Sequence, residues 1–99
     1  MQLVRVLLPI YDNEQEPLPP SAVAQELIEQ FGGLTAFTRA PAEGLWRNKE
    51  ARTSRDEIVV YEVMVEEVDR QWWQSYREGL EARFRQERVV VRAQEIQRL

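Results

Sequence analysis

The chain contains no cysteine and no histidine among its 99 residues. Without cysteine it can form no disulfide, no thiolate nucleophile and no thiolate-bound metal site. Without histidine it lacks the commonest general base, the commonest zinc ligand and the proximal ligand of most haem sites. Any catalysis would depend on carboxylates, tyrosine, serine or threonine, arginine, or an outside cofactor. We therefore predict a protein with no cofactor and no metal.

Long apolar runs are also missing. Arg5 divides the first apolar run, so we predict neither a signal peptide nor a membrane span, and we expect a cytoplasmic protein. The net charge of −4 argues against wholesale binding to nucleic acid or to an anionic membrane. Arginine outnumbers lysine twelve to one, which is typical of proteins from GC-rich bacterial genomes. The length is that of one domain, residues 1–99.

The longest strand-like run covers residues 57–66 and is apolar on both faces. One face carries Val59, Tyr61, Val63 and Val65, and the other carries Ile58, Val60 and Met64, interrupted by Glu62. A strand with one face in water should alternate cleanly between apolar and polar side chains. We therefore expect this run to lie in the middle of a sheet, with Tyr61 toward the helices and something covering the other side.

The rest of the chain predicts alternating strands and helices. We predict strands at 2–10, 34–39, 57–66 and 88–92, and helices at 21–31 and 70–86. Gly32 follows the first helix as a left-handed stop, and Asp69 precedes the second as an N-cap. Residues 41–56 form either an extended hairpin loop or a pair of strand extensions, and the tail 93–99 either extends the last strand or folds back. The order β-α-β-β-α-β is typical of the α+β ferredoxin-like sandwich, a four-stranded antiparallel sheet with two helices on one face.

The sheet face away from the helices is the first candidate surface. We expect it to carry Leu3, Arg5, Leu7, Ile58, Val60, Glu62 and Met64. This face would expose several hundred Å² of apolar surface, more than a soluble monomer usually leaves uncovered. We predict a face-to-face homodimer, as in dimeric α+β barrels, with Arg5 and Glu62 paired within the interface. The alternative is that the C-terminal tail covers the face.

The second candidate is the segment 39–55, which carries five basic residues and two acidic ones, a balance of +3. Trp46 follows Gly44 within it. A basic loop with an aromatic side chain can hold a phosphate, a carboxylate or a base. The alternative is a solvated hairpin whose tryptophan folds back onto the domain. The predicted ligand-binding residues are Arg39, Trp46, Arg47, Arg52 and, from the second helix, Arg83.

The third candidate is a cluster on the second predicted helix. It comprises Trp72, Trp73, Tyr76, Arg77, Arg83 and Gln86. A stripe at helical spacing, formed here by Trp73, Tyr76, Leu80 and Phe84, usually packs into the core. Arg83 lies beside this stripe, so we expect it to meet a carboxylate, either Glu62 or Glu87. No paired carboxylates at catalytic spacing and no phosphate-binding or nucleophile motif accompany the cluster.

Several short runs resemble one family. They are residues 33–39 (GLTAFTR), 43–47 (EGLWR), 56–60 (DEIVV) and 83–89 (RFRQERV), with Tyr76 between the last two. Together they resemble a family of small uncharacterised bacterial proteins, about 100 residues long, with a ferredoxin-like fold. The resemblance covers residues 31–92 and implies no activity. These runs include Gly44, Trp46, Arg47, Arg83 and Gln86, so the resemblance strengthens the case that these residues are functional.

These features favour a non-enzymatic, homo-oligomeric binding module. Residues 39–55 would contact an anionic small ligand or an acidic protein partner, with no nucleic acid and no membrane involved. The alternative is a cofactor-independent enzyme of the dimeric α+β barrel type, monooxygenase- or isomerase-like. In that case Tyr61, Trp72, Tyr76 and Arg83 would line its cavity.

Overall fold

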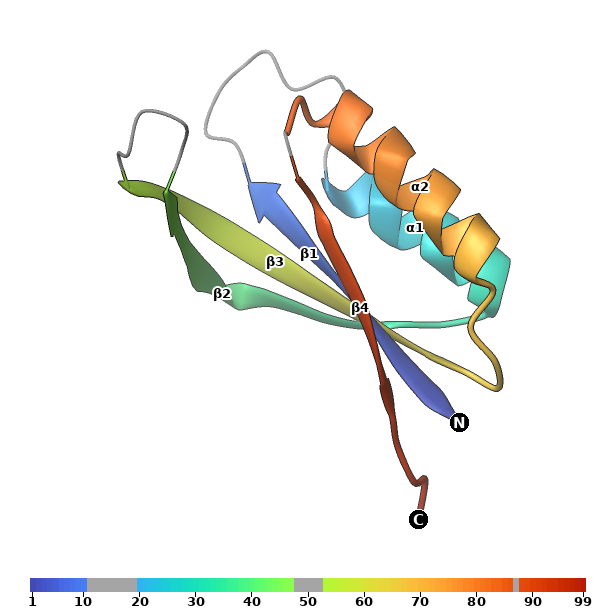
Figure 1. Ribbon diagram of the computed structural model, residues 1–99. Helices are drawn as coiled ribbons and strands as arrows, with labels where there is room; N and C mark the ends of the chain where they lie inside the picture. Colours follow the sequence, from blue (N-terminus) through green and yellow to red (C-terminus); the bar gives the residue numbers. More distant parts are fainter. Residues whose placement is uncertain (11–19, 48–52, 87) are drawn as a thin grey trace.

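The computed structural model describes residues 1–10, 20–47, 53–86 and 88–99, with side chains for 1–9, 21–37, 58–86 and 88–99. Its elements are β1 (Gln2–Ile10), α1 (Pro20–Phe31), β2 (Thr35–Arg47), β3 (Thr53–Val65), α2 (Arg70–Arg83) and β4 (Val90–Glu95). The strand order is β2-β3-β1-β4, and each neighbouring pair is antiparallel. Both helices lie on one side of this sheet (Figure 1). The predicted ferredoxin-like α+β fold, with β1 and β3 central, is confirmed.

The core lies between the sheet and the two helices. Alternate residues of the two central strands point into it, as the two-residue period of a strand requires. Its buried members are Val4, Val6 and Leu8 of β1, Val59, Tyr61 and Val63 of β3, Val23 and Leu27 of α1, Trp73 and Leu80 of α2, and Phe84 and Val89 beyond α2. The predicted position of Tyr61 toward the helices is therefore confirmed.

The second strand is much longer than the sequence predicts. We expected it to end at Ala40 and Pro41, yet β2 continues to Arg47. A break in register between Phe37 and Ala42 leaves residues 38–41 opposite Val59 alone. A bulge of this kind absorbs a proline that cannot donate a ladder hydrogen bond. Most of the segment 41–56 therefore forms strand extensions, the second of the two alternatives.

The predicted start of α2 and the predicted end of α1 are both observed. Asp69 caps α2 by accepting a hydrogen bond from the Trp72 amide at 3.1 Å, and Gly32 ends α1 with a φ of 85°. Val23 and Leu27 are the buried residues of α1, and Ala24 and Phe31 pack against the core beside them. Ile28, although apolar, lies off this stripe and is 42% exposed.

The second helix ends at Arg83, three residues earlier than predicted. Arg85 adopts a left-handed conformation with a φ of 53°. The Gln86 amide donates to the carbonyl of Glu81 at 2.9 Å, and the Arg85 amide donates to that of Ala82 at 3.4 Å. This pattern is a Schellman motif with arginine where glycine is usual. The last strand accordingly begins at Val90 and runs to Glu95, rather than from 88 to 92.

Candidate functional site

The sheet face opposite the helices carries an apolar row that crosses all four strands. Phe37 of β2 pairs with Val60 of β3, which pairs with Leu7 of β1, which pairs with Val90 of β4. Residues directly opposite one another in an antiparallel sheet point to the same face. Phe37 is 49% exposed and Val90 is 41% exposed. The sequence prediction missed these two, because only the strand register places them beside Leu7 and Val60.

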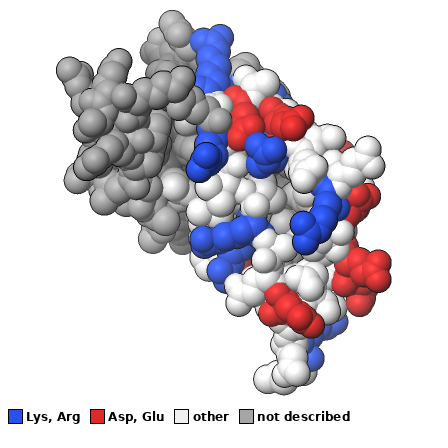
Figure 2. All heavy atoms as spheres, in the orientation of Figure 1, with Lys and Arg blue, Asp and Glu red and all other residues white. Residues whose placement is uncertain are grey.

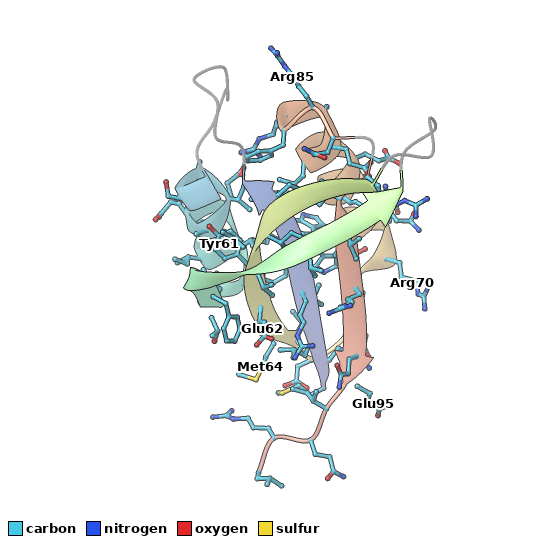
Figure 3. All side chains as sticks on the ribbon, turned by 90° about the vertical axis from the view of Figure 1, so that its left-hand side faces the viewer. Tyr61, Glu62, Met64, Arg70, Arg85 and Glu95 are labelled. Atoms are coloured by element: carbon cyan, nitrogen blue, oxygen red, sulfur yellow. The ribbon has the colours of Figure 1, made fainter. Side chains whose placement is uncertain are left out.

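Next to this row lies an ion pair. Arg5 and Glu62 are directly opposite on β1 and β3, and Arg5 Nε donates to Glu62 Oε1 at 2.6 Å. The predicted pairing of these two charges is confirmed, although its place within an interface stays a prediction. The following pair on the same face, Leu3 and Met64, is apolar again, and Met64 is 55% exposed (Figure 3). We use "open face" for these residues together: Leu3, Arg5, Leu7, Phe37, Val60, Glu62, Met64 and Val90.

The C-terminal tail does not cover the open face. β4 extends to Glu95, opposite Gln2, and the Ile96 amide then donates to the carbonyl of Met1 at 3.0 Å. The remaining residues continue past the end of β1, away from the sheet (Figure 1), and Leu99 is fully exposed. Of the two predicted alternatives for the tail, it extends the last strand.

The outer halves of β2 and β3 form a two-stranded ribbon. The pairing of β1 with β3 ends at Ile10 and Glu57, whereas β2 and β3 stay paired as far as Arg47 and Thr53. Arg39, Trp46 and Arg47, three predicted ligand-binding residues, belong to β2, and their side chains lie outside those described. Arg52 lies outside the described residues altogether. Seen from the side of the open face, the ribbon crosses in front of the sheet (Figure 3).

Arg83, the fifth predicted ligand-binding residue, binds a carboxylate of α1. Its Nη1 donates to both oxygens of Glu26, at 2.7 and 2.8 Å. Our prediction of Glu62 as its partner is wrong, because Glu62 pairs with Arg5 on the other face of the sheet. The alternative partner, Glu87, lies outside the described residues. Glu26 was missed because the pairing depends on how the two helices cross, which no local pattern encodes.

The aromatic residues of the third candidate pack between the two helices. Phe31 of α1 stacks on Trp73 with ring centroids 5.1 Å apart and meets Trp72 edge-on at 5.2 Å. Trp72 stacks on Tyr76 at 4.9 Å, and the Tyr76 hydroxyl donates to Glu26 Oε2 at 3.3 Å. Burial raises the pKa of Tyr76 far above its ordinary value, and the Glu26 carboxylate raises it further. These contacts stabilise the helix pair.

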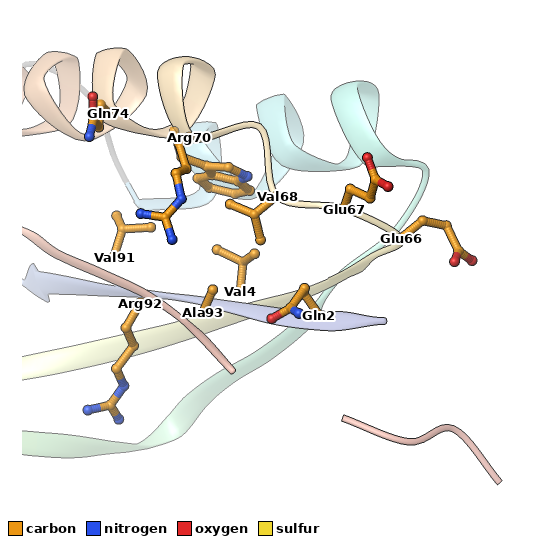
Figure 4. Close-up of a pocket in the computed structure, with 11 residues that line it drawn as sticks. Gln2, Val4, Glu66, Glu67, Val68, Arg70, Gln74, Val91, Arg92 and Ala93 are labelled. Carbon is orange, nitrogen blue, oxygen red and sulfur yellow. The ribbon is translucent and has the colours of Figure 1, made fainter. Parts of the chain in front are cut away.

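The four residues of the enzyme alternative lie apart from the cavity that the structure shows. Tyr61 is buried in the core, while Trp72, Tyr76 and Arg83 are half-buried and contact α1. A cavity of about 530 Å³ lies elsewhere, between the first turns of α2 and the strands β1 and β4 (Figure 4). Its lining includes Val4, Val68, Arg70, Trp73, Val91 and Ala93. None of the four residues of the enzyme alternative belongs to this lining.

Charged side chains of both signs are interspersed over the described surface shown in Figure 2, with no large patch of one sign. Among the described residues, no group of three or more carboxylates could hold a metal ion. None of the helices in the described part of the chain combines the length and the apolar character needed to cross a membrane.

Comparison of the chain with protein-family models, curated proteins and solved structures found no match. The resemblance to a family of small bacterial proteins therefore stays a prediction. Of the two candidate surfaces for binding a partner or ligand, the open face and the segment 39–55, only the open face has its side chains described.

Proposed function

We propose that the protein is a non-enzymatic binding module that associates with a second copy of itself through the open face. The observation that carries this proposal is the apolar row of Phe37, Val60, Leu7 and Val90, which crosses the whole sheet on the side without helices. Contiguous apolar patches of this extent usually mark an interaction site. The basic segment 39–55 would then contact an anionic small ligand or an acidic partner.

The charge arrangement favours a second copy as the occupant. Arg5 and Glu62 neutralise each other within one subunit, so a partner can cover this pair without burying an unpaired charge from it. Arg92, opposite Arg5 on the edge strand β4, is exposed and would lie at the rim of the contact. Leaving Arg5 or Glu62 unpaired would be costly, because an isolated charge buried in a dry interface costs several kcal/mol. The same face on another copy offers an equally apolar surface with the same Arg5–Glu62 pair. A two-fold dimer buries the same patch from both subunits, so each copy covers the exposed apolar surface of the other.

The ribbon formed by β2 and β3 would complete the interface. Four strands spaced about 4.8 Å apart make a face only about 15 Å wide, whereas a stable interface buries about 800 Å² per partner. The ribbon crosses in front of the open face (Figure 3), where it would extend the contact. A two-stranded ribbon is marginally stable on its own. Packing against a partner would stabilise the ribbon.

The proposal for the ligand rests on the charge of the segment 39–55. Its +3 balance stands in a chain whose net charge is −4. It comprises the outer part of β2, the start of β3 and the residues between them, far in sequence from the helix contacts of Arg83. A thermal-shift screen against nucleotides and small carboxylates tests this part. Stabilisation that disappears in an Arg47→Gln, Arg52→Gln double variant supports it, and no stabilisation by any compound contradicts it.

Self-association is tested by sedimentation equilibrium at about 1–100 μM. We expect a dimer for the unchanged protein and a monomer for a Phe37→Glu, Met64→Glu variant, because both side chains are about half exposed and their replacement disturbs the open face more than the core. Ile28→Glu is the matched control, since Ile28 is similarly exposed but lies on α1. It should remain a dimer. A monomeric unchanged protein at 100 μM would contradict the proposal.

A further inference from the structure

A groove lies at the opposite end of β3 from the ribbon. Val4, Val91 and Ala93 form its floor on the helix side of the sheet, where Val4 is directly opposite Ala93. Val68 and Trp73 form an apolar wall, and Arg70 extends from the first turn of α2. Its volume of about 530 Å³ falls within the range of small-molecule sites.

One charged group is positioned over this floor. Figure 4 shows the guanidinium of Arg70 above Val91, while the side chain of Arg92 points to the other face of the sheet. The carboxylates of Glu66 and Glu67 point outward, away from the floor. Arg70 forms no ion pair with any of the described residues. The lining also includes Arg92, but only the Arg70 guanidinium lies over the apolar floor, and it has no counter-ion among the described residues.

We propose that this groove binds a small monocarboxylate with an apolar tail, such as a medium-chain aliphatic acid. The guanidinium of Arg70 presents paired N–H donors that match a carboxylate. Val68, Val91 and Ala93 are half-buried or exposed, so they would receive the tail and release the water that covers them. A single cation with two carboxylates near the rim disfavours polyanions such as nucleotides. An ammonium ligand is disfavoured because Arg70 holds the charged position.

This inference does not rest on the proposed function. The groove is lined by residues between Glu66 and Gln74 together with residues of β1 and β4, whereas the segment 39–55 includes the opposite end of β3. The open face lies on the other side of the sheet from the groove. Binding at the groove can therefore succeed or fail independently of self-association and of a ligand at 39–55.

The experiment is an amide chemical-shift titration with hexanoate, followed by NMR of the labelled full-length protein. We expect saturable shifts at Val4, Val68, Arg70, Val91 and Ala93. Hexylammonium at the same concentration should give no such shifts. Arg70→Gln should weaken hexanoate binding at least ten-fold. Arg92→Gln is the matched control, because it removes the same charge beside the groove from a side chain that points away, and it should bind as the unchanged protein does.

A second variant tests the floor. Ala93 is exposed on β4, so Ala93→Leu should fill the groove without disturbing the core, and it should abolish the hexanoate shifts while the thermal midpoint stays within about 2 °C. Three results would each overturn the inference: no saturable shifts up to 10 mM hexanoate, equal binding by Arg70→Gln, or shifts confined to residues 39–55. The last result would assign the carboxylate to the ribbon instead.

Discussion

Arg83 and Glu26 join the two helices across 57 positions of sequence, with Arg83 Nη1 2.7 Å and 2.8 Å from the two carboxylate oxygens. The Tyr76 hydroxyl also donates to Glu26. One carboxylate of α1 therefore satisfies two donors of α2. Arg83 Nε is buried and has no acceptor among the described residues, so the whole guanidinium depends on Glu26 for its neutralisation.

Removing Glu26 should destabilise the protein. Glu26→Ala leaves Arg83 and Tyr76 without their acceptor, and we expect the free energy of unfolding to fall by about 1 kcal/mol, a moderate value because the pair is partly exposed. Urea unfolding measures the change. Glu29→Ala is the control, because Glu29 is exposed and accepts only a 3.4 Å hydrogen bond from Gln25. Equal effects of the two substitutions would contradict this role for Glu26.

Stability should fall at alkaline pH because of Tyr76 and Tyr61. Burial raises the pKa of both hydroxyls in the folded protein, and the Glu26 carboxylate adds to the effect at Tyr76. In the unfolded chain both ionise near pH 10. The unfolded state therefore loses protons first, so stability is intact below pH 10 and declines as the pH rises above it.

Urea unfolding between pH 8 and pH 11 measures this decline. Tyr76→Phe cannot ionise, so the variant should lose less stability over that interval than the unchanged protein, even if its stability at pH 8 is lower. A slope that Tyr76→Phe leaves unaltered would show that other groups cause the decline.

Much of the fold follows from local patterns in the sequence. The two-faced apolar run around Tyr61 indicates a central strand, and the alternation of strands and helices indicates the topology. The positions of Arg5 and Glu62 on adjacent central strands also predict their pairing. Each of these inferences uses only the period of an element and the order of elements along the chain.

Features that depend on register and crossing angle were not predictable. Pro41 favours the end of a strand, yet a bulge lets β2 continue. Phe37 and Val90 join the open face only because the register aligns them with Val60 and Leu7. The partner of Arg83 depends on how α1 and α2 cross. The sequence therefore predicted the open face in outline and missed its two outer members.

The left-handed residue after α2 should respond to substitution by glycine. Arg85 has a φ of 53°, a conformation that costs a residue with a side chain about 1 kcal/mol. Arg85→Gly should raise the free energy of unfolding by roughly 0.5–1 kcal/mol. Arg88→Gly removes the same charge at a position without a positive φ and should give no gain. Destabilisation by Arg85→Gly would indicate a contact of its side chain that outweighs the backbone strain.

Two glycines should respond to alanine in opposite directions. Gly79 lies within α2, and a Cβ there meets nothing within 4 Å, so Gly79→Ala should stabilise the helix by about 0.5–1 kcal/mol. Gly32 has equal space but a φ of 85°, so Gly32→Ala should destabilise the protein by about 1 kcal/mol. Thermal and urea unfolding measure both. Neither glycine is crowded, so the comparison of the two variants measures the effect of backbone conformation alone.

Charge reversal at Arg5 and Glu62 tests whether their pair lies within the proposed interface. Because Arg92 of β4 is also opposite Arg5, the test is made in an Arg92→Gln background, where Arg5→Glu places two carboxylates opposite each other on β1 and β3 without a neighbouring cation on β4. If a second copy covers them, the dimer dissociation constant should rise by at least about 30-fold, since an unpaired buried charge costs about 2–5 kcal/mol.

The double reversal, Arg5→Glu with Glu62→Arg, restores a neutral pair at the same position and should recover most of the affinity. Sedimentation equilibrium of the single and double variants measures both constants, with unfolding curves as a check on the monomer. If Arg5→Glu lowers the stability of the fold but leaves the dimer constant unchanged, the pair only links β1 to β3. The partner would then have to occupy the apolar row alone.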